Sequence, residues 1–221
     1  MTFKLPHAAT IVRSLAAIVG ILAVMHILVS MSYHLTDSNV LGSVRWFFDL
    51  DTEKNLPTWF SSVTLFVCAM LFGLIGMSRS DDADEFRNYW LGLALVFSFL
   101  SLDEMSMLHE RATTRVVLPV TALIGLIYIP FLQSLTREQL RLFILAAVVY
   151  VGGAMGLEAI GNNFSIHFAQ DSFAYSMLVM VEEVLEMAGT LIMMYTLLHY
   201  AEELATSRTA SLRSSQRNAP N

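Results

Sequence analysis

The segment 173–200, FAYSMLVMVEEVLEMAGTLIMMYTLLHY, constrains the fold of this chain more than any other. It is 28 residues long and contains no Pro, Lys or Arg, and about 20 apolar residues suffice for a helix to cross a bilayer. Near its middle, however, stand Glu182, Glu183 and Glu186, which share one face of a helix with about 100° per residue. Because a carboxylate in hydrocarbon costs about 2.5–3.5 kcal/mol, these three side chains need counter-charges, protons or a metal ion.

The composition indicates an integral membrane protein. Of the 221 residues 55% are hydrophobic and 14% are charged, whereas soluble domains carry about 25% charged residues. Cys68 is the single cysteine, so neither a disulfide nor a multi-cysteine metal site can form within the chain. The formal charge of −6 and the lack of a basic stripe argue against nucleic acid as a partner.

Six apolar segments predict an all-α fold, a polytopic bundle of six transmembrane helices within a domain at 1–204. The expected spans are 9–34, 57–78, 88–115, 116–134, 140–161 and 173–200. Residues 205–221 are polar and rich in Ser and Arg, which is typical of a disordered tail. Six spans place both termini on one side, and the segments on that side hold nine Lys and Arg residues against four on the other. By the positive-inside rule both termini are expected in the cytoplasm.

This topology predicts that acids from three helices reach similar depths. At 1.5 Å per residue, Asp103 and Glu104 lie about 23 Å from the cytoplasmic start of the third span, and Glu158 about 27 Å along the fifth. The sixth span runs back inward, so Glu182 and Glu183 lie roughly 14 Å below the outer surface and Glu186 about 20 Å. We therefore expect the third, fifth and sixth spans to surround an acidic pocket in the outer half of the bilayer.

The first interpretation of this pocket is a metal site. Carboxylates with an imidazole suit Fe, Mn or Zn as divalent or trivalent ions, and helical bundles commonly build such sites from several helices. The usual Glu-x-x-His motif is absent, which weakens the case for two irons. The expected metal ligands are Glu104, His109, Glu110, Glu158, Glu182, Glu183 and Glu186, with Asp103, Arg111 and Asn162 in support. A site at this depth favours a metal-dependent enzyme on a lipid or isoprenoid substrate, and no nucleophile motif suggests another chemistry.

Two other interpretations remain open. The same acids could form a proton or cation path in a small transporter, because neighbouring buried carboxylates raise one another's pKa and retain protons. Alternatively, they could be structural and pair with Arg111, Arg115 and Asn162 to fix the helix register.

Two features outside the pocket have simpler interpretations. His26 lies within the first span and is expected to be hydrogen-bonded inside the bundle. The string Asp49, Asp51 and Glu53 lies between the first two spans and is expected to be a solvated acidic loop.

Four motifs together carry a resemblance to a known family. They are WFFDLDTEKNLPTWFSS at 46–62, LDEMSMLHER at 102–111, GGAMGLE at 152–158 and VEEVLEM at 181–187. In combination they resemble an uncharacterised family of bacterial multi-pass inner-membrane proteins. The resemblance implies a bacterial inner-membrane location and points to the acids of these motifs as shared residues, but it implies no activity or cofactor.

Overall fold

The chain folds into helices throughout the part that the structure describes. The computed structural model describes residues 7–36, 42–52, 54–79, 85–106, 114–157 and 172–217, and none of these residues lies in a strand. The helices are α1 (Ala8–Thr36), α2 (Gly42–Phe48), α3 (Leu56–Ser78), α4 (Arg87–Ser106), α5 (Thr114–Ile127), α6 (Ile129–Ser134), α7 (Arg137–Val151), the π-helix η3 (Gly152–Leu157) and α9 (Phe173–Arg217). The expectation of an all-α protein is confirmed.

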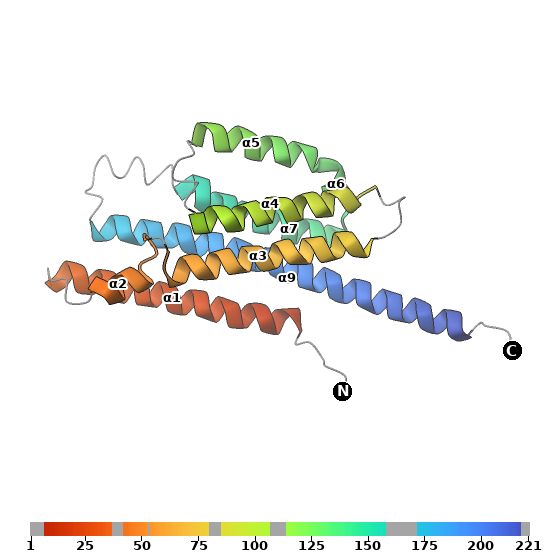
Figure 1. Cartoon of the computed structure of the whole chain (residues 1–221), viewed down its shortest axis with the longest axis horizontal. Helices are drawn as coiled ribbons and strands as arrows, with labels where there is room; N and C mark the ends of the chain where they lie inside the picture. Colours follow the sequence, from red (N-terminus) through yellow and green to blue (C-terminus); the bar gives the residue numbers. More distant parts are fainter. Residues whose placement is uncertain are drawn as a thin grey trace.

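The long helices run lengthwise along one bundle, and the chain direction alternates from each to the next (Figure 1). Helix α9 lies at the centre of this arrangement, where it packs against α1, α3, α7 and η3. The start of α1 meets the far part of α9, because the Ala8 backbone N–H donates to Glu202 Oε1 at 3.0 Å. One end of the bundle holds the start of α1, the end of α3 and the starts of α4 and α7 (Figure 1).

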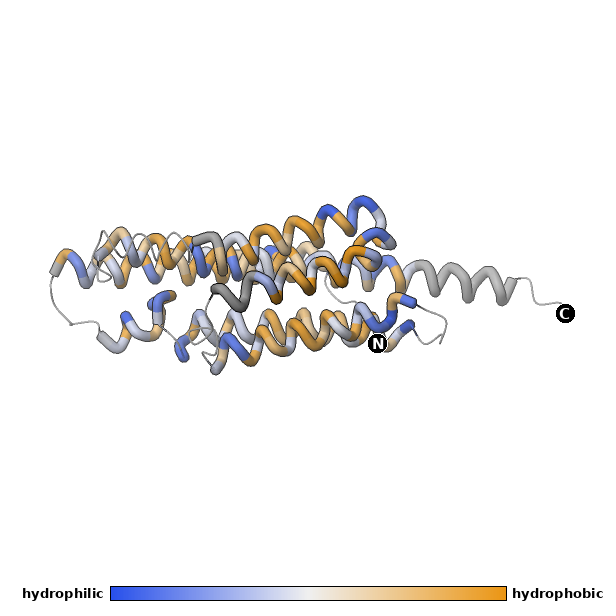
Figure 2. Tube along the Cα trace, turned by 90° about the horizontal axis from the view of Figure 1, so that it is seen from above, coloured by the Kyte–Doolittle hydropathy of each residue, from blue (hydrophilic) through white to orange (hydrophobic). Residues whose placement is uncertain are grey.

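Three helical segments are long and apolar enough to cross a membrane: Ala8–Leu35, Leu56–Ser78 and Arg137–Met155. Six were expected from the sequence. Helices α4 and α9 fall outside this group because they carry acids, and α5 because it has only 14 residues. Apolar residues fill the middle stretches of the helices (Figure 2), and many of them, such as Ile21, Leu74 and Val148, are exposed. A surface of this kind suits contact with lipid.

An aromatic cluster packs five helices together where α9 leaves the bundle. Trp90 of α4 is fully buried and stacks on Tyr200 of α9 with 4.9 Å between ring centroids. Phe131 of α6 meets the edge of the same indole at 5.0 Å, and Phe72 of α3 and Phe143 of α7 complete the cluster. Burial of such large rings stabilises a core by roughly 1.5–3 kcal/mol each.

Two buried serines join α3 to α4 nearer the opposite end. The Ser62 hydroxyl donates to the Ser101 carbonyl at 2.9 Å, and the Ser101 hydroxyl donates to the Ser62 carbonyl at 2.9 Å. Reciprocal bonds of this kind fix the two helices in one register, because each buried hydroxyl needs its partner. The acids Asp103 and Glu104 follow Ser101 within one helical turn, so this pair also fixes their height in the bundle.

Helix α9 extends past the bundle into the segment for which a tail was predicted. Helix α9 continues without a break to Arg217 and projects beyond the other helices (Figure 1). Extending an existing helix needs no new nucleation, which is the unfavourable step in forming a helix. The segment 201–217 contains neither Pro nor Gly, so nothing in its sequence stops the helix. The division of the chain at residues 204 and 205 stays a prediction.

Candidate functional site

Helices α7 and α9 cross in direct backbone contact. A Cβ atom at Gly189 of α9 would lie 2.6 Å from the Tyr150 backbone nitrogen and 2.8 Å from its Cα. A Cβ atom at Gly153 of η3 would lie 2.9 Å from the Glu182 carbonyl oxygen. Small residues permit such an approach between membrane helices. Gly153 and Gly189 therefore allow η3, α7 and α9 to approach at backbone distance.

The π-helix η3 follows α7 and forms the second part of this crossing. It covers Gly152–Leu157 and continues α7 directly. Short π-helical turns are rare and frequently lie at functional sites, because the extra residue re-aims the side chains around it. The turn ends at the residue before Glu158, one of the predicted ligands.

Four described acids of α4 and α9 lie within electrostatic range of the hydroxyl group of Tyr150. The negative charges of Glu186, Glu104, Glu183 and Asp103 all act on this hydroxyl. Two of these acids come from α4 and two from α9, whereas Tyr150 is on α7. The four acidic side chains are half-buried and take part in polar or electrostatic interactions within the chain. The charges of two acids on α4 and two acids on α9 are thus felt at one hydroxyl on α7.

Five of the predicted acids lie in the part of the chain that the structure describes. The charges of Asp103, Glu104, Glu183 and Glu186 reach Tyr150, and the charge of Glu182 acts on Tyr175, one helical heptad earlier. Among the residues that the structure describes, no three His, Cys, Asp or Glu side chains are placed to hold a metal ion. The remaining predicted residues lie outside the described ranges: His109, Glu110, Arg111, Glu158 and Asn162.

Sequence reasoning missed Tyr150. Its signal was its place in the fifth span. Every other residue of 142–157 is apolar or glycine, and Tyr150 alone carries a hydroxyl. It stands three residues before Gly153, so both lie on the same face of the helix. A polar side chain beside a close-packing glycine marks the face that meets another helix.

A second polar network lies beside the start of α9. His26 of α1 is fully buried, and its Nδ1 lies 3.2 Å from Asp49 Oδ1 and 3.0 Å from the Leu50 nitrogen. Its Nε2 lies 3.0 Å from the Ser176 hydroxyl of α9. The imidazole therefore joins α1, the segment after α2 and α9. The prediction of a hydrogen-bonded histidine inside the bundle is confirmed.

Asp49 corrects the expectation of a solvated acidic loop. Only 4% of Asp49 is exposed, and its carboxylate accepts from the Asp51 N–H at 3.1 Å and from Arg45 Nε at 3.2 Å. Asp51 itself is exposed, as expected, and Glu53 lies outside the described residues. Burial of Asp49 is tolerated because every bonding direction of its carboxylate meets a donor or a positive charge.

We expect Asp49→Asn to be less stable than the unchanged protein at pH 7, with a difference that shrinks below about pH 4. Burial alone would raise the pKa of Asp49. The hydrogen bonds with His26 and the Asp51 N–H, and the charges of His26 and Arg45, outweigh it and hold this pKa below 3.8. A depressed carboxyl pKa stabilises the fold above its unfolded value, and that stability is lost as pH falls through the folded value. Circular dichroism during heating at pH 3–7 measures the unfolding temperature of each protein, with Asp51→Asn as the exposed control. A stability difference that does not depend on pH would contradict the conclusion that His26 and Arg45 lower the pKa of Asp49.

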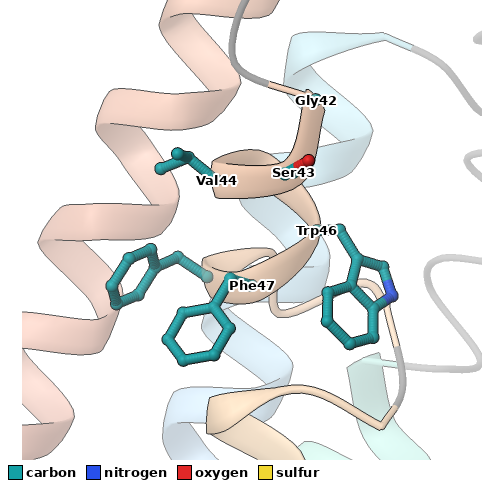
Figure 3. A pocket seen from close by; sticks show the side chains of 6 residues that line it. Gly42, Ser43, Val44, Trp46 and Phe47 are labelled. Carbon is teal, nitrogen blue, oxygen red and sulfur yellow. The ribbon is translucent and has the colours of Figure 1, made fainter.

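A shallow hollow of about 660 Å³ lies against α2 (Figure 3). Val44 and Trp46 project to opposite sides of the short helix, and both are exposed. The lining consists of Gly42, Ser43, Val44, Trp46, Phe47 and Phe48. Because this lining holds no ionisable side chain, the hollow offers apolar contact rather than acid–base or metal chemistry.

The comparisons with known proteins identify a family. No curated protein and no solved structure matches the chain. A family model described as "Domain of unknown function (DUF8692)" matches residues 13–201, a range that contains α2–α7, η3 and most of α1 and of the bundle part of α9. The chain therefore belongs to the DUF8692 family.

Proposed function

We propose that this chain is a multi-pass protein of the bacterial inner membrane, with six spans and both termini in the cytoplasm. The alternating helix directions support six crossings, with α4, the α5–α6 pair and α9 joining the three most apolar helices. The start of α1, the end of α3 and the starts of α4 and α7 share one end of the bundle (Figure 1), and at these element ends the sequence has Arg13, Arg79, Arg87 and Arg137. By contrast, Arg45, Lys54 and Arg115 belong to α2, to the residues before α3 and to the start of α5, at the opposite end. The richer basic end is the cytoplasmic one by the positive-inside rule.

Within this membrane protein we infer a carboxylate site in the outer half of the bilayer that binds a metal ion. The observation that supports this inference is that Glu104 of α4 and Glu183 and Glu186 of α9 are half-buried in the bundle and that their charges reach the Tyr150 hydroxyl. Like charges that lie near one another in a medium of low dielectric repel, and a multivalent cation relieves this repulsion. No three of the described side chains are placed to hold an ion by themselves, so the proposed ligand set draws on described and undescribed residues together: Glu104, His109, Glu110, Glu158, Glu182, Glu183 and Glu186.

The proposed ion is Fe, Mn or Zn, and it would supply a Lewis-acid or redox centre to a membrane enzyme. A lipid-like substrate suits a site at this depth because such a molecule reaches the site without leaving the bilayer. The chain's own residues would hold the ion through the α4 and α9 acids, while the α7–α9 crossing keeps Tyr150 beside it.

Elemental analysis of the purified protein tests this proposal. We expect metal in stoichiometric amount, and its loss in Glu104→Gln and in Glu186→Gln. The matched control is Glu138→Gln, at an exposed glutamate in the first turn of α7, about 18 Å along the helix from Tyr150, which should keep the metal. A metal-free protein with full stability after purification without chelators would overturn the metal site.

The alternative is a proton- or cation-coupled transporter that uses the same acids. The arrangement of α9 favours it, because Tyr175, Glu182, Glu186 and Gly189 recur at helical spacing and form one stripe along the helix. Protein reconstituted into vesicles with a trapped pH-sensitive dye tests this function. Proton flux that Glu186→Gln abolishes, in a protein without bound metal, would favour the transporter over the metal site.

A further inference from the structure

The hydrogen bonds of His26 determine which of its ring nitrogens carries the proton. Its Nε2 lies 3.2 Å from the Ser176 carbonyl oxygen, and because a carbonyl oxygen can only accept, Nε2 carries a hydrogen and donates it. On the other side of the ring, Nδ1 accepts from the Leu50 N–H at 3.0 Å, so this nitrogen presents its lone pair. Both bonds agree with a neutral imidazole whose proton is on Nε2.

The same Nδ1 also lies next to an acid. Asp49 Oδ1 is 3.2 Å away, and in the neutral ring no hydrogen stands between the two atoms. Other donors hold the carboxylate in this place, because the Asp51 N–H donates to Oδ1 and Arg45 Nε donates to Oδ2. A proton added to Nδ1 would join the ring to Asp49 through a charge-assisted hydrogen bond. This charged form of the ring is the one whose hydrogen bond and charge lower the pKa of Asp49.

The two contacts at Nδ1 exclude each other. An imidazole nitrogen has a single bonding direction in the plane of the ring, so a hydrogen on Nδ1 displaces the Leu50 N–H. His26 and Leu50 are both buried, and a buried N–H that loses its acceptor is unfavourable. Protonation of the ring therefore strengthens its contact with Asp49 and releases the backbone of Leu50.

Leu50 connects this site to the core of the bundle. Its side chain is buried in a cluster with residues of α1 and α9, namely Val19, Leu22, Met187 and Leu191. Its neighbour Asp49 is tied to the start of α3, because the Asn55 side chain donates to the Asp49 carbonyl. A shift of the backbone at Leu50 would therefore act on the packing of α1 against α9.

A nucleophilic role of the same residues does not fit the tautomer. The order Asp49, His26, Ser176 is that of a serine hydrolase triad, in which Nδ1 donates to the aspartate and Nε2 takes the proton of the serine. Here Nε2 already carries a hydrogen, so the neutral ring cannot act as the base for the Ser176 hydroxyl. The arrangement suits the binding of a proton at Nδ1 instead.

Titratable side chains on three elements surround the ring in the described part of the chain. They are His34 on α1, Arg45, Asp49 and Asp51 on α2 and the segment after it, and Tyr175 and Glu182 on α9. Asp49 is the one whose carboxylate lies within 3.2 Å of His26.

We propose that Nδ1 of His26 and the carboxylate of Asp49 form a proton-binding site, and that a proton bound there releases the Leu50 N–H. The site responds to pH on the outer side of the membrane and transmits the change to α9 through Leu50. Only this sidedness rests on the proposed function. The proton site itself depends neither on the orientation of the chain nor on a bound metal, so it can be tested in detergent.

Nuclear magnetic resonance of the full-length protein tests the tautomer first. With nitrogen-labelled histidine, the spectrum distinguishes a protonated from an unprotonated ring nitrogen. The chain has six histidines, and single replacements of the other five by glutamine identify the signal of His26 by elimination. We expect Nε2 to carry the proton at pH 8 and both nitrogens to carry one at pH 5, the range in which histidines commonly titrate. A neutral His26 with its proton on Nδ1 would overturn the proposal.

Hydrogen exchange of the Leu50 amide tests the release. Asp49–Leu50 is the only Asp-Leu pair in the sequence, so carbonyl-labelled Asp with nitrogen-labelled Leu identifies this amide. After correction for the intrinsic effect of pH, its protection should fall about tenfold from pH 8 to pH 5.

Two histidine variants are the controls. His26→Gln should make the protection of Leu50 independent of pH. His34→Gln should leave the fall unchanged, because His34 lies two turns further along α1 and its Nδ1 bonds to the Ser30 carbonyl. Protection that does not change with pH in the parent, or that falls equally in His26→Gln, would overturn the proposal.

Discussion

Replacing Gly189 with alanine is expected to lower the unfolding temperature by roughly 6–12 °C. One methyl group at this position would lie within 2.8 Å of three Tyr150 atoms, the backbone N and Cα among them. Overpacking of a core costs about 1–3 kcal/mol where side chains can move aside. Here backbone atoms oppose the new methyl group, so the cost should be about 3 kcal/mol or more, and 1 kcal/mol shifts the unfolding temperature of a chain of this size by about 2–4 °C.

Cys68 makes this measurement direct. It is the single cysteine and is fully buried in α3, so a thiol-reactive fluorescent dye reports its exposure as the protein unfolds in detergent. The control is Gly20→Ala, because a Cβ at Gly20 meets no atom within 4 Å. Equal unfolding temperatures for the two variants would show that α7 and α9 do not touch at Gly189.

The same substitution should affect the acids around Tyr150. Moving α7 away from α9 separates the Tyr150 hydroxyl from Glu183 and Glu186, so the metal content of Gly189→Ala should fall together with its stability. If the metal were retained at full stoichiometry in a destabilised Gly189→Ala protein, Tyr150 would not belong to the proposed site.

Helix starts were predictable because their signals are local. Pro57 was expected at the beginning of the second span, and α3 starts at Leu56 with Pro57 in its first turn. The fifth span was expected from residue 140, and α7 begins a few residues earlier, at Arg137, where Thr136 caps it through a reciprocal pair of bonds with Gln139. A cap depends on residues within one turn of each other, so a single sequence contains all that is needed.

The heights of the acids on α4 and α9 could be estimated from the sequence, because the rise per residue of a helix is fixed. Counting residues predicted that Asp103, Glu104 and Glu186 lie in one region of the bundle, and the charges of all three reach Tyr150, while their meeting in one site stays a prediction. Which residue of α7 would meet them was not predictable. That depends on the rotation of α7 about its axis, which the Gly153 and Gly189 contacts set through packing between segments distant in the sequence.

Asp49 shows a different limit. An alternating acidic string with polar neighbours is usually solvated, and Asp51 is indeed exposed. Asp49 is buried because His26, 23 positions earlier in the chain, is brought beside it by the packing of α1. Local composition holds no information about such a distant partner, so the sequence alone could not distinguish the two acids.

The second large effect is expected at Asn55, which holds the segment between α2 and α3 in place. Its Oδ1 accepts from the Thr58 N–H and hydroxyl, and its Nδ2 donates to the carbonyls of Trp46 and Asp49 and to the Thr52 hydroxyl. Asn55 is only 2% exposed. Asn55→Ala leaves buried groups without partners, at about 1–3 kcal/mol for each, and removes the cap of α3. We expect a total loss of roughly 3–5 kcal/mol.

Asn55→Asp separates the two roles of this side chain. The carboxylate keeps the acceptor for Thr58 and so keeps the cap of α3, but it cannot donate to the Asp49 and Trp46 carbonyls. Its loss of stability in the dye assay should still be large, because a charge would face two carbonyl oxygens. Since the Asp49 backbone is held by Asn55 and its side chain meets His26, Asn55→Ala, which adds no titratable group, should also remove the pH dependence that Asp49 contributes below about pH 4. A destabilised Asn55→Ala protein that retains this pH dependence would mean that Asp49 keeps its place beside His26 without Asn55, and that α1 rather than the cap of α3 positions it.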